Sequence, residues 1–219
     1  MCYNGTKEVI KMEEKVLSII DILKRRYPDP MCALHYEKDY ELMIAVRLSA
    51  QCTDARVNLV TPALFAAYPT LEAMASAPIE HVEELVHSCG FYKHKARDIV
   101  LACQMLLSDY DGKVPGTMEQ LLRLPGVGRK TANLLLGDLY AVPGSVVCDT
   151  HCMRICERLG LSKGREPEKV EKQLRAILPP EESSDFCHRI VLFGRDCCTS
   201  QRPKCGECPL VMHCKEYNV

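Results

Sequence analysis

Apolar residues recur with the period of an α-helix along most of the chain. Four of them share one helical face just before the segment Tyr27-Pro28-Asp29-Pro30, where a helix must end: Val16, Ile19, Ile20 and Leu23. The segment from Asp39 to Leu48 is apolar nearly all round, which predicts a central, buried helix. The same period continues through Ile99, Cys103 and Leu106. Helices therefore dominate the pattern.

Residues that favour helix ends occur at intervals along the chain and predict where these helices begin. The predicted starts are Thr53, Thr61-Pro62, Thr70, Thr117, Asp149, Glu166-Pro167 and Ser183 or Ser184. Thr117 and Gln120 have the spacing of a capping box, and Gly90 lies where a C-terminal cap is expected. The sequence has no convincing run of alternating apolar and polar residues between hairpin turns, and no repeat at a fixed period. We therefore predict an all-α protein.

Composition narrows the class of protein. The chain has 219 residues, of which 47% are hydrophobic and 26% charged, enough for one sizeable core or two small ones. No stretch approaches the roughly 18 to 20 apolar residues that span a bilayer, and the first residues lack a signal-peptide core, so we expect a cytoplasmic protein without a membrane partner. Because the net charge is -1, any surface that binds nucleic acid must be a local basic patch.

A glycine turn between two apolar segments occupies residues Leu121 to Leu136. Gly126 and Gly128 permit a tight turn and leave the N–H groups of the following helix directed outward, where a phosphate can accept them. This pattern is a helix-hairpin-helix, which grips DNA without reading its sequence. A nucleotide phosphate-binding loop is excluded because its glycine-lysine spacing is not met and no strand precedes the glycines. A plain tight turn between packed helices is the alternative for the motif taken alone.

Two ionisable residues follow this turn. Lys130 lies in the first turn of the second helix, where the helix dipole and Arg129 disfavour its ammonium form. A neutral amine can attack an electrophilic sugar carbon and hold it as an imine; the alternative is a solvated surface lysine. Asp149 lies at a predicted helix start, which keeps its carboxylate ionised and is equally compatible with an ordinary N-cap.

Four of the fourteen cysteines lie in one C-terminal loop: Cys198, Cys205, Cys208 and Cys214. Structural zinc usually takes two Cys-x2-Cys pairs, whereas this loop has one such pair flanked by longer, uneven arms, which favours a [4Fe-4S] cluster. Disulfides would need an oxidising compartment. Cys148, Cys152 and Cys156 recur every four residues, but buried thiols on a helix face are the preferred interpretation there.

Together these segments resemble the endonuclease III family of DNA glycosylases, within the helix-hairpin-helix superfamily. The resemblance spans almost the whole chain and is carried by Leu48–Asp54, Gly90–Ala96, Leu124–Ala132, Asp149–His151 and the four-cysteine loop. It implies a two-domain glycosylase fold. A six-helix domain with the hairpin would cover residues 31–142, and a [4Fe-4S] helical domain would combine residues 1–30 with 143–219. The first eleven residues precede the usual family start, so Met12 is a plausible initiator and these residues are expected to be disordered.

The family resemblance also implies an activity. The chain would be a bifunctional DNA glycosylase that excises oxidised or damaged pyrimidines from double-stranded DNA and cleaves the abasic site by β-elimination. Lys130 would displace the base at C1′. Asp149 would assist, either by stabilising positive charge at the sugar or by helping to deprotonate the lysine. The protein would act as a monomer, associated with the nucleoid if it is bacterial.

The same resemblance implies where DNA is held. A base that leaves the duplex must be replaced, and Gln51 and Phe91 match the family positions that probe the gap, although many relatives have an aliphatic residue where this chain has Phe91. A buried core aromatic is the alternative for Phe91. Further contacts are implied for Gly126, Val127, Gly128, Arg129, Arg202 and Lys204. The cluster would be a rigid scaffold, because glycosidic cleavage and elimination consume no electrons.

Two other functions stay open at this point. A related adenine or mismatch-type monofunctional glycosylase shares the aspartate and the cluster but lacks a lysine at position 130. A non-catalytic DNA-binding module that senses redox state through its cluster belongs to a different class. The presence of both Lys130 and Asp149 favours the bifunctional enzyme.

Overall fold

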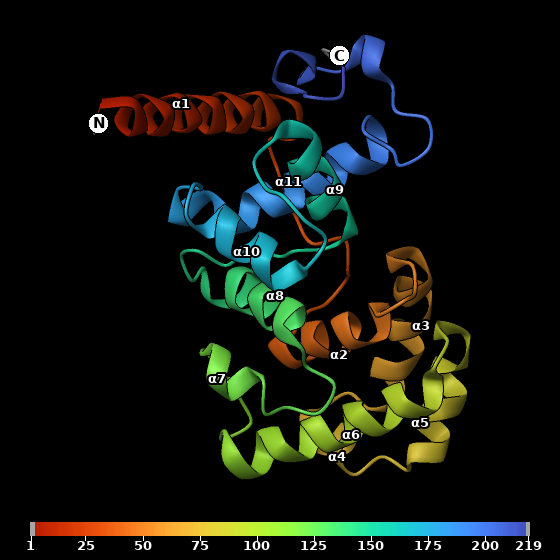
Figure 1. The fold of residues 1–219 in the computed structure, drawn as a ribbon. Helices are drawn as coiled ribbons and strands as arrows, with labels where there is room; N and C mark the ends of the chain where they lie inside the picture. The colour runs from red at the N-terminus through yellow and green to blue at the C-terminus, as the bar shows by residue number, and fades with distance from the viewer. Residues whose placement is uncertain (1–2, 218–219) are drawn as a thin grey trace. The chain divides into compact units, whose positions relative to one another are not determined.

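The computed structural model describes residues 3–217, which form α-helices and short 3-10 helices joined by turns (Figure 1). No β-strand occurs among these residues, so the prediction of an all-α protein is confirmed. The chain divides into two compact units, one of residues Cys32–Tyr140 and one of Met1–Met31 with Ala141–Val219. Each unit is described by itself below.

The unit of Cys32–Tyr140 is built around one central helix. Its elements are α2 (Asp39–Ser49), α3 (Asp54–Ala67), α4 (Leu71–Ala75), α5 (Ile79–Val86), η1 (His87–Cys89), α6 (Tyr92–Asp109), α7 (Met118–Leu121) and α8 (Arg129–Tyr140). Helix α2 contacts α3, α6 and α8 (Figure 1). All of its residues from Tyr40 to Val46 are buried, as its apolar pattern predicts, because neighbours cover it on several sides.

Most predicted helix starts of this unit are confirmed by their caps. The hydroxyls of Thr53, Thr70 and Thr117 each accept the backbone N–H three residues on. The start predicted at Thr61-Pro62 is wrong, because α3 runs through Pro62. Proline removes one helical hydrogen bond there, but Val57, Val60 and Leu64 stay buried only if the helix continues. Burial of the apolar face therefore outweighs the local signal.

The second unit joins the two ends of the chain. Its elements are α1 (Tyr3–Arg26), α9 (Thr150–Leu159), α10 (Pro167–Arg175), η2 (Pro180–Glu182), α11 (Ser183–Asp196), η3 (Cys205–Glu207) and η4 (Val211–His213). Helix α11 contacts both α1 and α9 and buries Phe186, Ile190 and Phe193. The four apolar residues that define the face of α1 are all buried, as predicted. None of the described helices is both long and apolar enough to cross a membrane.

The N-terminal segment differs from expectation. Disorder is expected for the first eleven residues, of which the first two lie outside the described part of the chain. The expectation is wrong for the other nine, because α1 begins at Tyr3. Residues 12–26 are anchored by burial of their apolar face, and once a helix is nucleated each further residue adds a hydrogen bond at little cost. The helix therefore extends beyond its packed part, and Val9 and Ile10 are exposed.

Two leucines of α1 provide a test of this packing. Leu23 is fully buried, whereas Leu17 is 49% exposed on the same helix. Leu23→Ala should lower the free energy of unfolding by about 2 to 5 kcal/mol, since it leaves a cavity in the core, while Leu17→Ala should change it by less than about 0.5 kcal/mol. Urea denaturation followed by circular dichroism measures both. Equal losses in the two variants would contradict the packing of α1 on its unit.

Candidate functional site

The predicted hairpin lies between α7 and α8. The N–H of Val127 donates to the carbonyl of Leu124 at 3.1 Å, and this closes the turn. Gly126 has φ +75°, a left-handed conformation that favours glycine. The N–H of Ala132 donates to Gly128 O at 2.9 Å as α8 begins, so the N–H groups of residues 129–131 precede the first hydrogen bond of the helix. They form the positive end of α8.

A partly buried ion pair supports this turn from inside the unit. Arg47 on α2 donates from Nε at 2.9 Å and from a terminal nitrogen at 2.6 Å to the same carboxylate oxygen of Asp98 on α6. A Cβ placed on Gly126 would overlap Arg47 Nε and would lie 2.7 Å from Arg47 Cδ and 2.8 Å from Asp98 Oδ2. Glycine is therefore required at 126 by both its φ and its neighbours.

The second glycine of the turn has a different role from the first. Gly128 does not have a positive φ, and a Cβ added there would meet no atom within 4 Å. The expectation that both glycines permit the turn therefore holds for Gly126 only. Gly128 instead leaves exposed space beside the start of α8, where another molecule can approach the backbone.

The residues of the turn differ in exposure. Arg129 and Lys130 are exposed, and Lys130 lies in the first turn of α8 as predicted. The Val127 side chain is only 8% exposed and its N–H is used within the turn. The main chain and side chains that face outward are therefore those of Gly128, Arg129 and Lys130.

Asp149 belongs to the other unit, where it begins α9. Its Oδ1 accepts the backbone N–H of Cys152 at 2.7 Å, so the predicted N-cap is confirmed. The side chain is half-buried. This contact holds the carboxylate at the positive end of α9 and fixes its direction.

Further along α9, two arginines contact the loop of four cysteines. Arg154 donates to Cys198 O at 2.9 Å and interacts with Nδ1 of His151 at 3.2 Å. Arg158 donates to Cys198 Sγ at 3.3 Å and to Thr199 O at 3.0 Å. Helix α9 therefore carries Asp149 at its start and the cysteine loop along its side. The ring of His151 packs against Gly194, where an added Cβ would overlap it, which supports a packing role for this histidine.

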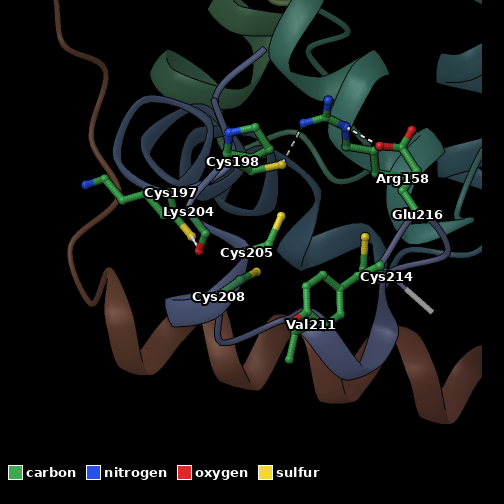
Figure 2. Close-up of a pocket in the computed structure, with 11 residues that line it drawn as sticks. Arg158, Cys197, Cys198, Lys204, Cys205, Cys208, Val211, Cys214 and Glu216 are labelled. Carbon is green, nitrogen blue, oxygen red and sulfur yellow. Dashed lines mark hydrogen bonds and ion pairs between the residues drawn. The ribbon is translucent and has the colours of Figure 1, made fainter. Parts of the chain in front are cut away.

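The four cysteines of the loop surround one cavity of about 260 Å³. The sulfurs of Cys198, Cys205, Cys208 and Cys214 face this space in Figure 2. Among the described residues, no three His, Cys, Asp or Glu side chains are grouped closely enough to hold a single metal ion. The donors line a chamber rather than converge on a point, which suits a group larger than one zinc ion.

A fifth cysteine lines the same cavity. Cys197 is only 3% exposed, and its sulfur donates to the Lys204 carbonyl at 3.7 Å (Figure 2). Burial raises the pKa of the Cys197 thiol to about 12. The geometry therefore favours Cys198 over its neighbour as the donor.

The thiols beside Asp149 form a packed group. Cys148, Cys152 and Cys156 are all buried, and the sulfurs of Cys152 and Cys156 lie 4.0 Å apart. Hydrogen bonds to neighbouring thiols and burial hold the pKa of Cys152 well above its usual range. The interpretation as buried thiols is confirmed for all three residues, but only Cys152 and Cys156 lie on a helix, because Cys148 precedes the start of α9.

Gln51 and Phe91 follow two neighbouring helix ends in the unit of Cys32–Tyr140. Both have positive φ, at 54° and 46°, and both are exposed. Phe91 is 66% exposed, so the alternative of a buried core aromatic is wrong. Such a backbone conformation is uncommon outside glycine and needs support from its surroundings.

The support comes from Lys95, to which sequence reasoning assigned no role. Its Nζ donates to Leu48 O at 2.9 Å and to Cys89 O at 2.7 Å, which are the carbonyls just before the two exposed segments. Lys95 is four residues before Ile99 on the buried face of α6. A lysine at a position where the helical period expects an apolar residue is the sequence signal that could have indicated its role.

Two basic residues of the cysteine loop are exposed. Arg202 and Lys204 both reach solvent, and Lys204 Nζ lies 3.9 Å from an oxygen of Asp196. That carboxylate also accepts from Arg26 at 2.7 Å. A loop that holds cationic side chains at its surface can meet an anionic partner.

Comparison with known proteins decides the family. Residues 44–180 match the model of the HhH-GPD superfamily base excision DNA repair proteins. Endonuclease III of Synechocystis sp. is 42% identical over 95% of both chains, and that of Bacillus subtilis is 40% identical over 90% of both. This chain belongs to the endonuclease III family.

Solved structures agree with this assignment to the endonuclease III family. A trapped endonuclease III–DNA covalent intermediate, the estranged-adenine complex, superposes with a TM-score of 0.88 at 42% identity and covers 94% of this chain and 97% of its own. A non-covalent endonuclease III–DNA complex also has a TM-score of 0.88, and covers 94% of this chain and 96% of its own. The resemblance and the fold class predicted from sequence are confirmed. The chain is a DNA glycosylase and abasic-site lyase of base excision repair, the enzyme class of its family.

The two hairpin glycines provide a matched test. Gly126→Ala should lower the free energy of unfolding by about 1 to 2 kcal/mol or more, because alanine disfavours the left-handed conformation and its Cβ would displace the Arg47–Asp98 pair. Gly128→Ala should change it by less than about 0.5 kcal/mol. Thermal and urea unfolding measure both variants. A Gly126→Ala protein as stable as wild type would show that the ion pair does not pack against the turn.

Proposed function

We propose that this endonuclease III family member excises oxidised or damaged pyrimidines from double-stranded DNA and cleaves the resulting abasic site by β-elimination, with Lys130 as its nucleophile. One observation carries the proposal. Lys130 is exposed and lies in the first turn of α8, the helix that follows the glycine hairpin. The residue that carries the amine therefore belongs to the same helical turn as the outward N–H groups.

The hairpin would bind the sugar-phosphate backbone. Main-chain N–H groups at the start of a helix, together with the helix dipole, favour an anion. The open space at Gly128 allows a phosphate to approach these groups, and the exposed Arg129 adds positive charge. Gly126 would contribute by keeping the turn tight. Val127 would contribute only by closing the turn, because its side chain is buried and its N–H donates to Leu124 O. Such contacts position DNA without selecting a sequence.

Lys130 would then act as a covalent catalyst. Its neutral amine forms a bond to C1′ while the bond from C1′ to the base breaks, and the base departs with that electron pair and takes up a proton. Opening of the sugar ring converts the adduct into an imine. Loss of a proton from C2′ then expels the 3′ phosphate as the leaving group, which is the β-elimination step. Water hydrolyses the remaining imine and regenerates the lysine amine.

Asp149 would assist the first step. Its carboxylate is fixed by the N-cap contact to Cys152, which leaves it as an oriented anion. It would act either by stabilising positive charge at the sugar or by helping to deprotonate Lys130. Both roles need a carboxylate with a fixed direction, which the N-cap contact provides.

Gln51 and Phe91 would occupy the gap left by the extruded base. Both are exposed on segments with left-handed backbone, which project them from the ends of α2 and η1. An aromatic face can stack in place of the missing base, while an amide can hydrogen-bond to the opposite one. Phe91 would thereby affect the preference for the opposite base.

The four cysteines would hold a [4Fe-4S] cluster, which the shape of their cavity supports. When bound, the cluster links the loop through its thiolates and acts as a scaffold. Arg202 and Lys204 would be presented by this loop to DNA phosphates. Because the substrate is genomic DNA, we place the protein in the cytoplasm, with the nucleoid if its source is bacterial, and we propose that it acts as a monomer.

The nucleophile can be tested by trapping. Borohydride reduces an imine to a stable amine, so wild-type protein should become covalently joined to a thymine-glycol duplex and to an abasic duplex. Lys130→Gln should abolish the joined product on both while retaining binding of the abasic duplex within about threefold, because the hairpin contacts remain. Gel electrophoresis and fluorescence anisotropy measure the two properties.

The neighbouring residue supplies the control for this experiment. Arg129→Gln should still form the joined product but bind DNA more weakly, because it removes charge rather than the amine. A joined product from Lys130→Gln would overturn the assignment. If wild-type protein excised the base but formed no covalent product, a monofunctional glycosylase would be favoured. If it showed neither excision nor trapping, a non-catalytic module would be favoured.

The cofactor can be tested by colour and metal content. Purified protein should show broad brown absorption near 400 nm and about four iron atoms per chain, as expected of a [4Fe-4S] cluster. Cys205→Ser should lose most of this absorption, whereas Cys197→Ser should keep it, because the thiol of Cys197 donates to the main-chain carbonyl of Lys204. Colourless protein with one zinc atom would contradict the proposal.

A further inference from the structure

Lys95 is a lysine inside the core of its unit. Only 1% of it is exposed, and its Nζ donates to two main-chain carbonyls, Leu48 O at 2.9 Å and Cys89 O at 2.7 Å. Burying a charged or polar group costs free energy unless hydrogen bonds compensate it, so these acceptors account for its location. Burial lowers the pKa of the Lys95 ammonium, as expected for a group removed from water.

The two acceptors belong to helix ends. Leu48 is in the last turn of α2 and Cys89 is the last residue of η1. Carbonyls in the last turn of a helix have no partner within it, and a cation is favoured there by the helix dipole. One side chain therefore caps two helix C-termini that are 41 residues apart in sequence (89 − 48).

Both capped ends lead directly into the proposed gap-filling residues. Gln51 follows Leu48 by three residues and Phe91 follows Cys89 by two, and both have positive φ and are exposed. A third link is main-chain, since the N–H of Lys95 donates to Phe91 O at 3.2 Å at the start of α6. Lys95 is thus joined to both segments at their base.

We propose that Lys95 is a positioning residue that sets the spacing of Gln51 and Phe91 for base extrusion. Its two hydrogen bonds join the end of α2 to the end of η1, and the side chains of Gln51 and Phe91 project from the segments that follow these two helix ends. This inference rests on the proposed function, because it assumes that these side chains enter the duplex. Lys95 contacts no substrate and takes no part in the covalent steps.

The test compares two lysines of the same helix. Lys95→Met keeps the length and apolar stem of the side chain but removes both hydrogen bonds, and Lys93→Met is the control because Lys93 is exposed. Single-turnover excision of thymine glycol from a duplex should fall roughly ten- to hundred-fold in Lys95→Met, since a displacement of about 1 Å can cost that much, and stay unchanged in Lys93→Met. Borohydride trapping on a single-stranded abasic oligonucleotide, which has no gap to fill, should stay within about threefold of wild type in both.

A double-mutant cycle separates positioning from a general structural role. In a background of Gln51→Ala with Phe91→Ala, Lys95→Met should cause no further loss of excision if it acts through those two residues. The proposal would be overturned if Lys95→Met reduced excision in this background by as much as it does in the wild-type background. It would also be overturned if folded Lys95→Met excised the base at the wild-type rate. Failure of wild-type protein to trap any abasic DNA would instead refute the proposed function, which keeps the two failures distinct.

Folding is controlled by circular dichroism and by a milder variant. If Lys95→Met does not fold, Lys95→Gln, which keeps a donor but is shorter, takes its place in the same assays with the same expected pattern. Wild-type excision by folded Lys95→Gln would overturn the proposal. Failure of both variants to fold would make Lys95 a residue of the core alone and would also overturn it.

Discussion

The hairpin depends on an ion pair that fills the space directly behind it. Arg47 and Asp98 come from two different helices, and their paired side chains lie where any Cβ on Gly126 would have to go. The turn can therefore lie this close to α2 and α6 only if residue 126 is a glycine in the left-handed conformation. That approach determines where α8 begins, and with it the direction of the N–H groups and of Lys130. A pair that is only about a fifth to a quarter exposed needs close geometry, because desolvation costs both charges.

The second unit uses α9 in a comparable way. The helix begins at a carboxylate that caps it and continues past two arginines that contact the cysteine loop. A side chain that caps a helix is held by the helix itself, so Asp149 has a defined direction without any other partner. The cysteine loop, which contains only short 3-10 helices, is in turn attached to a regular element. The residues to which we assign chemistry are thereby built on rigid structure.

Exposed residues in this protein are supported by buried polar contacts. Gln51 and Phe91 project into solvent with strained backbone, while the carbonyls beneath them are held by a lysine with almost no exposed surface. Buried polar groups of this kind tolerate few alternatives, because an unpaired carbonyl or ammonium in the core is costly. The core of the Cys32–Tyr140 unit is consequently both an apolar interior and a frame for the surface that we propose meets DNA.

The helices, the hairpin and the cysteine loop could be predicted from the sequence, because each depends on residues close together in the chain. Apolar period, capping threonines and a glycine turn predicted α2, α6 and the start of α8. The cysteine spacing predicted a shared [4Fe-4S] site, and the four cysteines line one cavity. Local signals failed at Pro62 and at the beginning of α1, where packing or helix propagation outweighs them. The side chains that support the site from below could not be predicted in this way, because they are set by how the helices pack. The Arg47–Asp98 pair joins residues 51 apart and Lys95 reaches a carbonyl 47 residues away, and no local pattern specifies a contact that forms when distant helices pack.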